Sequence, residues 1–288
     1  LLSISSLYFP SLFIAMCILF IYNGSNDDQS DYKLILISNR DEYYDRPTKN
    51  MESWYEHPIV IAGRDLQAKD ESTWLAISPT YKKIGVLLNL PGDKKEDALS
   101  RGKIVADYIK SNESVQSYVE GIKSYTKDCN GFIFVSVELG EVGVSTYSYT
   151  NVDDSLKAHN KACIGFSNSL PDTPLKKTEY GQSKMEEICN KFNKESMVEE
   201  LVKHLIQLLK CEESHLPDKI LEARQPNLYR ELSSVYVRIP KGRYGTRTHT
   251  IVILTKKGHL SVTELTQQYP IDCLNPVWQK TEFNFDIL

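Results

Sequence analysis

The chain has 288 residues, of which 41% are hydrophobic and 25% are charged, and its formal net charge is -4 at pH 7. This is the profile of an ordinary globular protein with enough residues for a sizeable core, and it gives no reason to expect a nucleic-acid partner or an anionic membrane surface. Six cysteines lie far apart without a CxxC pair, which argues against a structural zinc site or a dense disulfide framework and indicates a reducing compartment.

The first 22 residues, LLSISSLYFPSLFIAMCILFIY, are mostly apolar. A signal peptide or a spanning helix is disfavoured, because no basic residue precedes the run and four serines and Pro10 interrupt it. Met16 is the first methionine. We therefore expect residues 1–15 to be an extension outside the fold and residues 16–288 to form a single domain, with a genuine hydrophobic leader as the alternative.

The first predicted element is a β-hairpin. Two apolar runs, CILFIY at 17–22 and YKLILIS at 32–38, flank a polar segment rich in turn-forming residues. Pairing that is symmetric about Asp27 and Asp28 would put Cys17 opposite Ser38 and the start of the first strand beside Asn39-Arg40-Asp41. Both runs are continuously apolar, which predicts strands that are covered on both faces.

The rest of the chain alternates groups of strands with groups of helices. Apolar and β-branched runs predict strands at 58–63, 73–78, 83–89, 131–138, 142–150, 162–168, 248–255 and 260–266, the last two forming a second hairpin around Lys256-Lys257-Gly258. Helical spacing of apolar residues predicts helices at 95–110, 113–126, 179–192 and 196–210. This order favours an α+β fold with antiparallel layers over a parallel sheet.

Cys17 is the first candidate for chemistry, because it directly follows Met16. A cysteine in an apolar strand is usually inert packing. If Met16 were removed, however, Cys17 would carry both a thiol and a free α-amine, which titrates at about pH 7.7–8.0. Such an amine can serve as the base for its own side chain, as in N-terminal nucleophile hydrolases.

Arg40 and Asp41 directly follow the second predicted strand. A strand-end ion pair that meets solvent is the simpler interpretation and contributes little. The hairpin, however, brings this pair toward Cys17, and a second pair, Arg64-Asp65, follows another apolar strand. A fixed arginine near a thiol favours the thiolate and can orient a carbonyl group.

Two asparagines and a late arginine complete the candidates. Asn89 and Asn168 stand at strand exits, where asparagine is usually a turn former but can also donate to an oxyanion. Arg247 begins a predicted strand and is either a site cation or solvated, and His249 is predicted to be structural. The sequence has no glycine-rich phosphate loop, GxSxG or HExxH motif and no histidine pair at ligand spacing, so we predict no metal site.

The segments MCILFIY, ISNRDEYYDRP, AGRD, TWLAIS, GFSNSLPDTPLKK and YGTRTHTIVIL occur in the order of the NRDE family. That family includes the Transport and Golgi organisation proteins, and the resemblance spans residues 16 to about 266. It implies a four-layer αββα sandwich of antiparallel sheets, similar to N-terminal nucleophile hydrolases and, more distantly, to choloylglycine hydrolases and penicillin V acylases.

The resemblance also implies roles for individual residues. It matches Cys17 with the nucleophile, Arg40 with the arginine after the hairpin, Asp41 with a structural aspartate, Asn89 and Asn168 with oxyanion or positioning asparagines, and Arg247 with the late arginine. These six residues form the predicted site.

Two functions follow from the resemblance. The first is a trafficking factor for Golgi organisation and protein secretion, which holds haem or an acyl compound near Cys17, requires no cofactor, and is cytoplasmic with Golgi or mitochondrial association and peripheral membrane contact. The alternative is an N-terminal cysteine hydrolase of linear amides or thioesters. The resemblance brings no firmly established reaction, so the question of enzymatic activity stays open.

Overall fold

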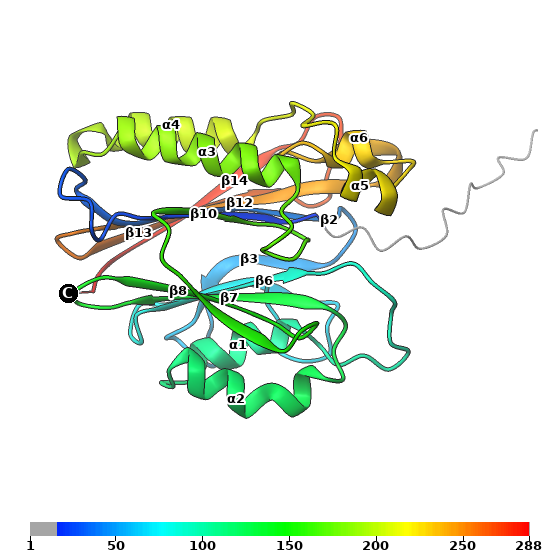
Figure 1. The fold of residues 1–288 in the computed structure, drawn as a ribbon, viewed down its shortest axis with the longest axis horizontal. Coiled ribbons are helices and arrows are strands. Elements are labelled where there is room, and N and C mark those ends of the chain that lie inside the picture. The colour runs from blue at the N-terminus through cyan, green and yellow to red at the C-terminus, as the bar shows by residue number, and fades with distance from the viewer. Residues whose placement is uncertain (1–15, 288) are drawn as a thin grey trace, which may run out of the picture.

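The computed structural model describes residues 16–287, which form two stacked antiparallel sheets between layers of helices (Figure 1). The first sheet has the strand order β10-β1-β2-β12-β13-β14, with the short β11 paired to β12. Its strands are β1 (Ile18–Asn23), β2 (Tyr32–Tyr43), β10 (Cys163–Phe166), β11 (Arg238–Ile239), β12 (Tyr244–Thr255), β13 (His259–Gln267) and β14 (Trp278–Asp286).

The second sheet follows chain order, β3-β4-β5-β6-β7-β8-β9, as a meander. Its strands are β3 (Thr48–Ser53), β4 (Ile61–Asp65), β5 (Leu75–Ser78), β6 (Lys83–Asn89), β7 (Phe132–Leu139), β8 (Val144–Thr150) and β9 (Ser155–His159). Every strand pair in both sheets is antiparallel.

Helices cover the outer face of each sheet (Figure 1). Helices α1 (Gly102–Lys110) and α2 (Val115–Thr126) pack on the second sheet, and α3 (Lys176–Lys191) and α4 (Val198–Leu209) pack on the first. A single 3₁₀ turn precedes α4, and the short helices α5 (Lys219–Arg224) and α6 (Tyr229–Leu232) follow it. The predicted α+β class and the αββα order are confirmed, whereas the N-terminal nucleophile hydrolase likeness stays a prediction.

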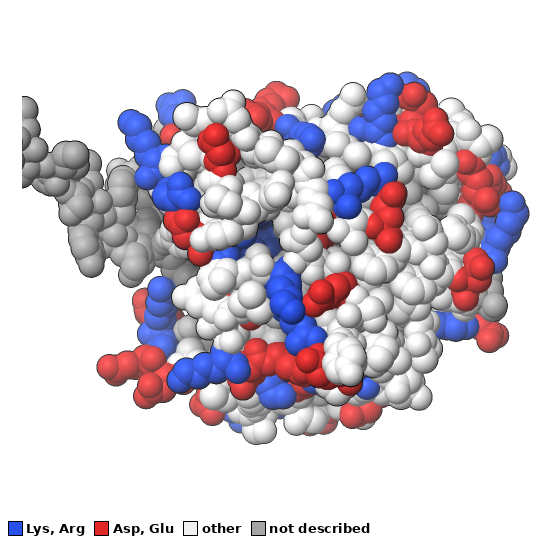
Figure 2. All heavy atoms as spheres, turned by 180° about the vertical axis from the view of Figure 1, so that it is seen from behind, with Lys and Arg blue, Asp and Glu red and all other residues white. Residues whose placement is uncertain are grey.

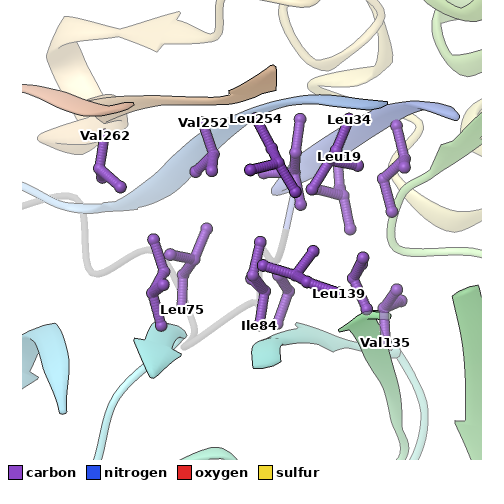
Figure 3. Packing of buried hydrophobic residues seen from close by; sticks show 14 of the residues in the cluster. Leu19, Leu34, Leu75, Ile84, Val135, Leu139, Val252, Leu254 and Val262 are labelled. Carbon is purple, nitrogen blue, oxygen red and sulfur yellow. The ribbon is translucent and has the colours of Figure 1, made fainter. Parts of the chain in front are cut away.

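The continuous apolar runs of β1 and β2 are explained by burial on both faces. Leu19 and Leu34 point into the core between the sheets, where they face side chains such as Ile84 of the opposite sheet (Figure 3). Ile18 and Phe20 point the other way, into the core beneath α3 and α4. Each fully buried aliphatic or aromatic side chain contributes about 1.5–3 kcal/mol relative to exposure, so these strands hold both layers together.

The register of the first hairpin differs from the predicted one by two residues. Ile18 pairs with Asn39, so Ser38 lies opposite Leu19 and the same register places Cys17 beside Arg40. The loop contains two successive turns, in which Asp27 N–H donates to the main-chain oxygen of Gly24 and Ser30 N–H donates to that of Asp27. These turns place the middle of the loop later in the chain than the symmetric pairing predicts. The expectation that the first strand begins beside Asn39-Arg40-Asp41 is nevertheless confirmed.

Most predicted elements appear with shifted ends. The segment 95–101 is not helical, because Lys95 N–H donates to Asn130 and Leu99 N–H donates to Asp128, which ties this segment to the chain after α2. The hairpin around Lys256-Lys257-Gly258 is confirmed by the pairing of β12 with β13. Six elements, β3, β9, β11, β14, α5 and α6, were not predicted from the sequence.

Helix α3 lies unusually close to the first sheet at Gly181. A Cβ atom on this residue would stand 2.1 Å from a ring carbon of Phe20 in β1, so only glycine fits. Lys177 and Met185 lie one turn to either side on the same buried stripe of the helix. The close contact at Gly181 therefore sets how deeply Lys177 reaches into the first sheet.

The described residues form no helix that is long and apolar enough to cross a bilayer. Figure 2 shows basic and acidic side chains side by side over one face, without a broad patch of one sign. The predictions for residues 1–15 lie outside the described residues.

Candidate functional site

Cys17 stands directly before β1, between two neighbouring strands. Extending the register of β1 with β2 by one step places Arg40 on one side of Cys17, and extending that of β1 with β10 by two steps places Asn168 on the other. The half-buried Cys17 side chain packs against the core between the sheets, and Sγ lies 3.7 Å from the main-chain oxygen of Asp41. The fold thus brings three of the predicted site residues to one end of the sandwich.

The thiol of Cys17 is held in its protonated form. Burial and the nearby Asp41 carboxylate raise the pKa of Cys17 to about 12, although the positive charge of Arg40 acts in the opposite direction. Because the nitrogen of Cys17 is in peptide linkage to Met16, it is an amide and provides no base. A nucleophilic thiolate at this position therefore requires another group to take the proton.

Arg40 points from the first sheet toward the second. Its guanidinium carbon lies 4.1 Å from the ring centroid of Trp74, and its side chain is only 6% exposed. Its ion-pair partner is Glu42, at 3.7 Å, which also lies 3.5 Å from Arg46. Arg46 is bound more closely to Asp65, at 2.6 Å. One carboxylate is thus shared between two guanidinium groups. The buried carboxyl groups of Asp41 and Glu264 also lie close enough to Arg40 to interact with it electrostatically.

Asn39 points from β2 toward the helical layer. Its Nδ2 donates to the main-chain oxygens of Leu209, at 2.8 Å, and Val235, at 2.9 Å, and its Oδ1 lies 2.6 Å from Nδ1 of His249. Burial lowers the pKa of His249 to about 3, so its ring is neutral. Asn39 and His249 therefore fix the end of α4, in agreement with a structural role for His249.

Asp41 is buried beside Thr246 of β12. Its Oδ1 accepts a hydrogen bond from the Thr246 hydroxyl at 2.6 Å, whereas Oδ2 has no hydrogen-bond partner among residues 16–287. Burial raises the pKa of Asp41 to about 7, and the charge of Lys177 opposes this rise. The carboxyl group can therefore gain or lose a proton near neutral pH.

Arg247 occupies a β-bulge of β12, between Thr246 and Thr248. Its guanidinium donates to the main-chain oxygens of Tyr43, at 2.9 Å, and Arg46, at 2.7 Å. Burial, followed by the nearby Arg40, lowers the pKa of Arg247 to about 10. Arg247 is close enough to Arg40 to interact electrostatically, but its hydrogen bonds hold the loop between β2 and β3.

The two predicted asparagines meet through a side chain and a main-chain group. Asn168 Nδ2 donates to the main-chain oxygen of Asn89 at 2.5 Å, which links the two sheets. Asn168 Oδ1 is buried without a hydrogen-bond partner among the described residues. In this arrangement the Asn168 amide donates to the chain itself, so an oxyanion role for either asparagine stays a prediction.

Lys177 was missed in the sequence, although it lies in the quoted GFSNSLPDTPLKK block. The side chain is 1% exposed, and its Nζ donates to the main-chain oxygens of Ser234, at 3.1 Å, and Met16, at 3.5 Å. The signal was a lysine at four-residue spacing from Gly181 and Met185, on the apolar stripe of α3. The second Arg-Asp pair, in contrast, lies within β4, where Arg64 stacks on Trp54.

Among residues 16–287, no three His, Cys, Asp or Glu side chains are grouped as a metal ion would require. The predicted residues fall into two sets. Arg40, Asp41 and Asn168 lie around Cys17, while Asn89 and Arg247 contact the backbone nearby. Their catalytic roles stay predictions.

Comparison with known proteins places the chain in a family. Residues 16–268 match the family model described as Transport and Golgi organisation 2. The chain is 37% identical to "Transport and Golgi organization protein 2" of Drosophila melanogaster, over 94% of this chain and 98% of the fly protein. It is 29% identical to the Mus musculus "Transport and Golgi organization 2 homolog" (94% and 99% covered) and 32% identical to the Bos taurus homolog (86% and 92% covered). The chain therefore belongs to the Transport and Golgi organisation 2 family.

Proposed function

We propose that this chain acts in transport and Golgi organisation, as the names of its relatives say of them, and in protein secretion. It does so by holding an acyl compound or haem at the site around Cys17. The observation that carries this proposal is the buried Arg40 beside Cys17, with an ion-pair partner that it shares with Arg46. A guanidinium group whose ion-pair partner is shared with a second arginine has donors left for an anionic ligand.

The surroundings of Arg40 suit an amphipathic ligand. Trp74 and the apolar core between the sheets provide an apolar wall, and the guanidinium provides donors for a carboxylate or a thioester oxygen. If haem is the ligand, Cys17 would hold its iron, because His249 is already bonded to Asn39 and sealed in the core. Haem carboxylates would then pair with Arg40.

Ligand titration tests this proposal directly. We expect haem to shift its Soret absorption at micromolar protein, or a long-chain acyl compound to change the fluorescence of Trp74. Arg40→Met should weaken either effect by about tenfold or more, and Cys17→Ala should remove the haem shift. Cys273→Ala, which alters a half-exposed cysteine elsewhere, is the matched control. Absence of both signals in the wild type would contradict the proposal.

The cellular role has its own test. We propose a cytoplasmic protein associated with the Golgi or mitochondria through peripheral membrane contact. Depleting it should slow the secretion of a reporter protein, and wild-type protein should restore the rate. If Arg40→Met restores the secretion rate as well as the wild type does, the cellular role does not depend on the ligand site.

A second candidate is an N-terminal cysteine hydrolase of linear amides or thioesters. Its supporting observation is the position of Cys17 between Arg40 and Asn168. Asp41 lies nearby, and its Oδ2 has no hydrogen-bond partner among residues 16–287. The mechanism needs Cys17 as the first residue, so that its free amine takes the thiol proton. The intact mass of the protein from its native cell tests that requirement, and unchanged turnover in Cys17→Ala would eliminate the mechanism.

A further inference from the structure

Strand β14 is the one long and regular edge strand among the four sheet edges of residues 16–287. The other three edge strands are short or irregular: β10 has four residues, β9 has five, and β3 has a register shift between Lys49 and Glu52. β14 (red in Figure 1) has nine residues, and its pairing with β13 is unbroken. An edge that is neither shortened nor bulged is a template for pairing with another strand, so β14 is the edge at which a further strand fits.

The hydrogen bonds at the two ends of β14 show which of its main-chain groups face outward. At one end, Gln268 N–H donates to the Val277 oxygen at 2.8 Å. At the other end, Ile287 N–H donates to the Gly258 oxygen at 3.0 Å. Because bonded and non-bonded pairs alternate along an antiparallel ladder, the odd-numbered residues of β14 bond to β13. The N–H and C=O groups of its even-numbered residues therefore point away from β13, where no strand of the described residues pairs with them.

The side chains of β14 alternate between the two faces of the sheet. Phe283 and Phe285 pack against the core between the sheets. Lys280, Glu282 and Asn284 lie on the opposite face, where they line a groove whose other wall is α4. Since this groove separates α4 from β14, the helix leaves the outward edge of β14 open to a second strand.

A second copy of β14 is complementary in charge to this edge. If two copies pair antiparallel about a two-fold axis at Thr281, outward-facing residues meet outward-facing residues, and Lys280 of each copy lies opposite Glu282 of the other. Within one chain these two side chains form an ion pair at 2.7 Å and are 56% and 52% exposed, so they are free to turn toward the other copy. Opposite charges directly across a strand pair are favourable, and the symmetry forms this pair twice.

The same register also covers an exposed apolar side chain. Val277, which directly precedes β14, is 62% exposed. With the axis at Thr281 it lies opposite Phe285 of the other copy, on the face toward the second sheet. An axis at Glu282 would instead set two copies of this carboxylate against each other, which is unfavourable. An axis at Phe283 would leave Val277 beyond the end of the other β14.

We propose that two copies of this chain form a symmetric dimer by pairing their β14 strands antiparallel about Thr281, so that the two first sheets become one continuous sheet. The interface is the same surface on both copies, and closed pairing of this kind ends at two subunits. It involves neither Cys17 nor Arg40, so it goes beyond the proposed function and does not depend on it. Because a single strand gives a small contact surface, we expect a Kd of about 1–100 μM.

Sedimentation velocity of the full chain over a range of concentrations tests the proposal. The wild type should pass from monomer to dimer as its concentration rises. Lys280→Glu and Glu282→Lys should each weaken the dimer by at least about tenfold, because each sets like charges across the edge twice. The double variant Lys280→Glu/Glu282→Lys exchanges the two charges, restores both cross-strand pairs, and should dimerise as the wild type does.

Lys184→Glu and Glu187→Lys are the matched controls. They reverse the charges of another exposed ion pair, 2.6 Å long, on α3, which packs on the far side of the first sheet against β10 and β1. Neither should change the dimerisation of the protein. A wild type that stays monomeric throughout would overturn the proposal. Wild-type dimerisation in Glu282→Lys, or a double variant that stays monomeric, would also overturn it, because either result excludes the axis at Thr281.

Amide hydrogen exchange in the wild type decides the matter if circular dichroism shows that a charge variant does not fold. In the dimer the outward N–H groups of Lys280, Glu282 and Asn284 become hydrogen-bonded. They should therefore exchange severalfold more slowly above the dimer Kd than below it. Amides of β9, an edge strand of the second sheet, should exchange at the same rate at both concentrations. Equal exchange of the three β14 amides at both concentrations would refute the proposal.

Discussion

The two halves of β2 are equally inaccessible to water but are stabilised in different ways. From Leu34 to Ile37 the strand is apolar, and its side chains alternate between the core of the sandwich and the core beneath α3 and α4. From Asn39 to Asp41 the side chains are polar and alternate in the same way, toward the helices and toward the other sheet. The first half stabilises the fold by burial, whereas the second half needs a specific partner for each group.

The difference between the two halves of β2 indicates which part of a buried strand can carry a functional site. An apolar strand tolerates changes that preserve volume, whereas each buried polar group depends on particular partners. The unpaired Oδ2 of Asp41 and the shared carboxylate of Glu42 show that the polar half is incompletely satisfied among the described residues. Substitutions in the two halves should therefore lower the stability of the fold for different reasons.

The largest effect is expected in the apolar half. Leu36→Ala leaves a cavity in the core between the sheets and should lower the free energy of unfolding by about 2–5 kcal/mol. Urea unfolding followed by circular dichroism measures it. A loss below about 0.5 kcal/mol would show that the two halves are not distinct in this way.

Asn39→Leu should have the next largest effect. It removes the donors to Leu209 and Val235 and the acceptor beside His249, so buried polar groups are left without partners at an expected loss of about 1–3 kcal/mol. Chemical unfolding again gives the value. Asn284→Leu, on the exposed side of β14, is the control and should change stability by less than about 0.5 kcal/mol.

Asp41→Asn should change stability in a pH-dependent way. The folded-state pKa of Asp41, about 7, is above its ordinary value of 3.8, so its contribution is fully present below pH 3.8 and is lost as the pH rises to about 7. The neutral amide does not ionise. Asp41→Asn should therefore gain stability relative to the wild type between pH 4 and pH 7, by about 1–2 kcal/mol after allowance for Lys177. A difference in unfolding free energy between Asp41→Asn and the wild type that is the same at pH 4 and pH 7 would contradict this expectation.

The smallest effect is expected at the contact between Arg40 and Trp74. Trp74→Phe keeps an aromatic ring but weakens the cation–π interaction, at an expected loss of about 0.5–1 kcal/mol. Thermal unfolding checks the loss. Trp54→Phe alters the matching contact with Arg64 away from Cys17 and serves as the comparison, because only the change at Trp74 should alter ligand binding.

The sequence predicted the apolar half of β2 far better than the polar half. Continuous runs such as ILFIY allowed the hairpin and its two-sided burial to be predicted, because hydrophobic periodicity depends on local spacing alone. The strands β3 and β14 were missed, since TKNMES and WQKTEFNFD are mostly polar and partly exposed. The register of the hairpin depended on turns within its loop that composition did not specify.

Within the site, the sequence identified which residues meet better than what each one contacts. Cys17, Arg40 and Asn168 were identified, and they lie at the same end of the neighbouring strands β1, β2 and β10. That Arg247 binds main-chain oxygens and that Asn168 donates to Asn89 depends on side-chain direction, which a single sequence does not reveal. Lys177 went unnoticed because nothing in its neighbourhood distinguishes a buried lysine from a solvated one, except its spacing from Gly181 and Met185.

Because Gly181 packs against Phe20, a single methyl group added at Gly181 would change contacts one helical turn away. A Cβ at Gly181 would have to push α3 outward from β1, because a ring carbon stands 2.1 Å from its position. One turn away, the Lys177 ammonium would be drawn back from the carbonyl of Met16. The thickness of this one layer therefore acts as a spacer, and it determines whether the lysine keeps its hydrogen bond to the main chain just before Cys17.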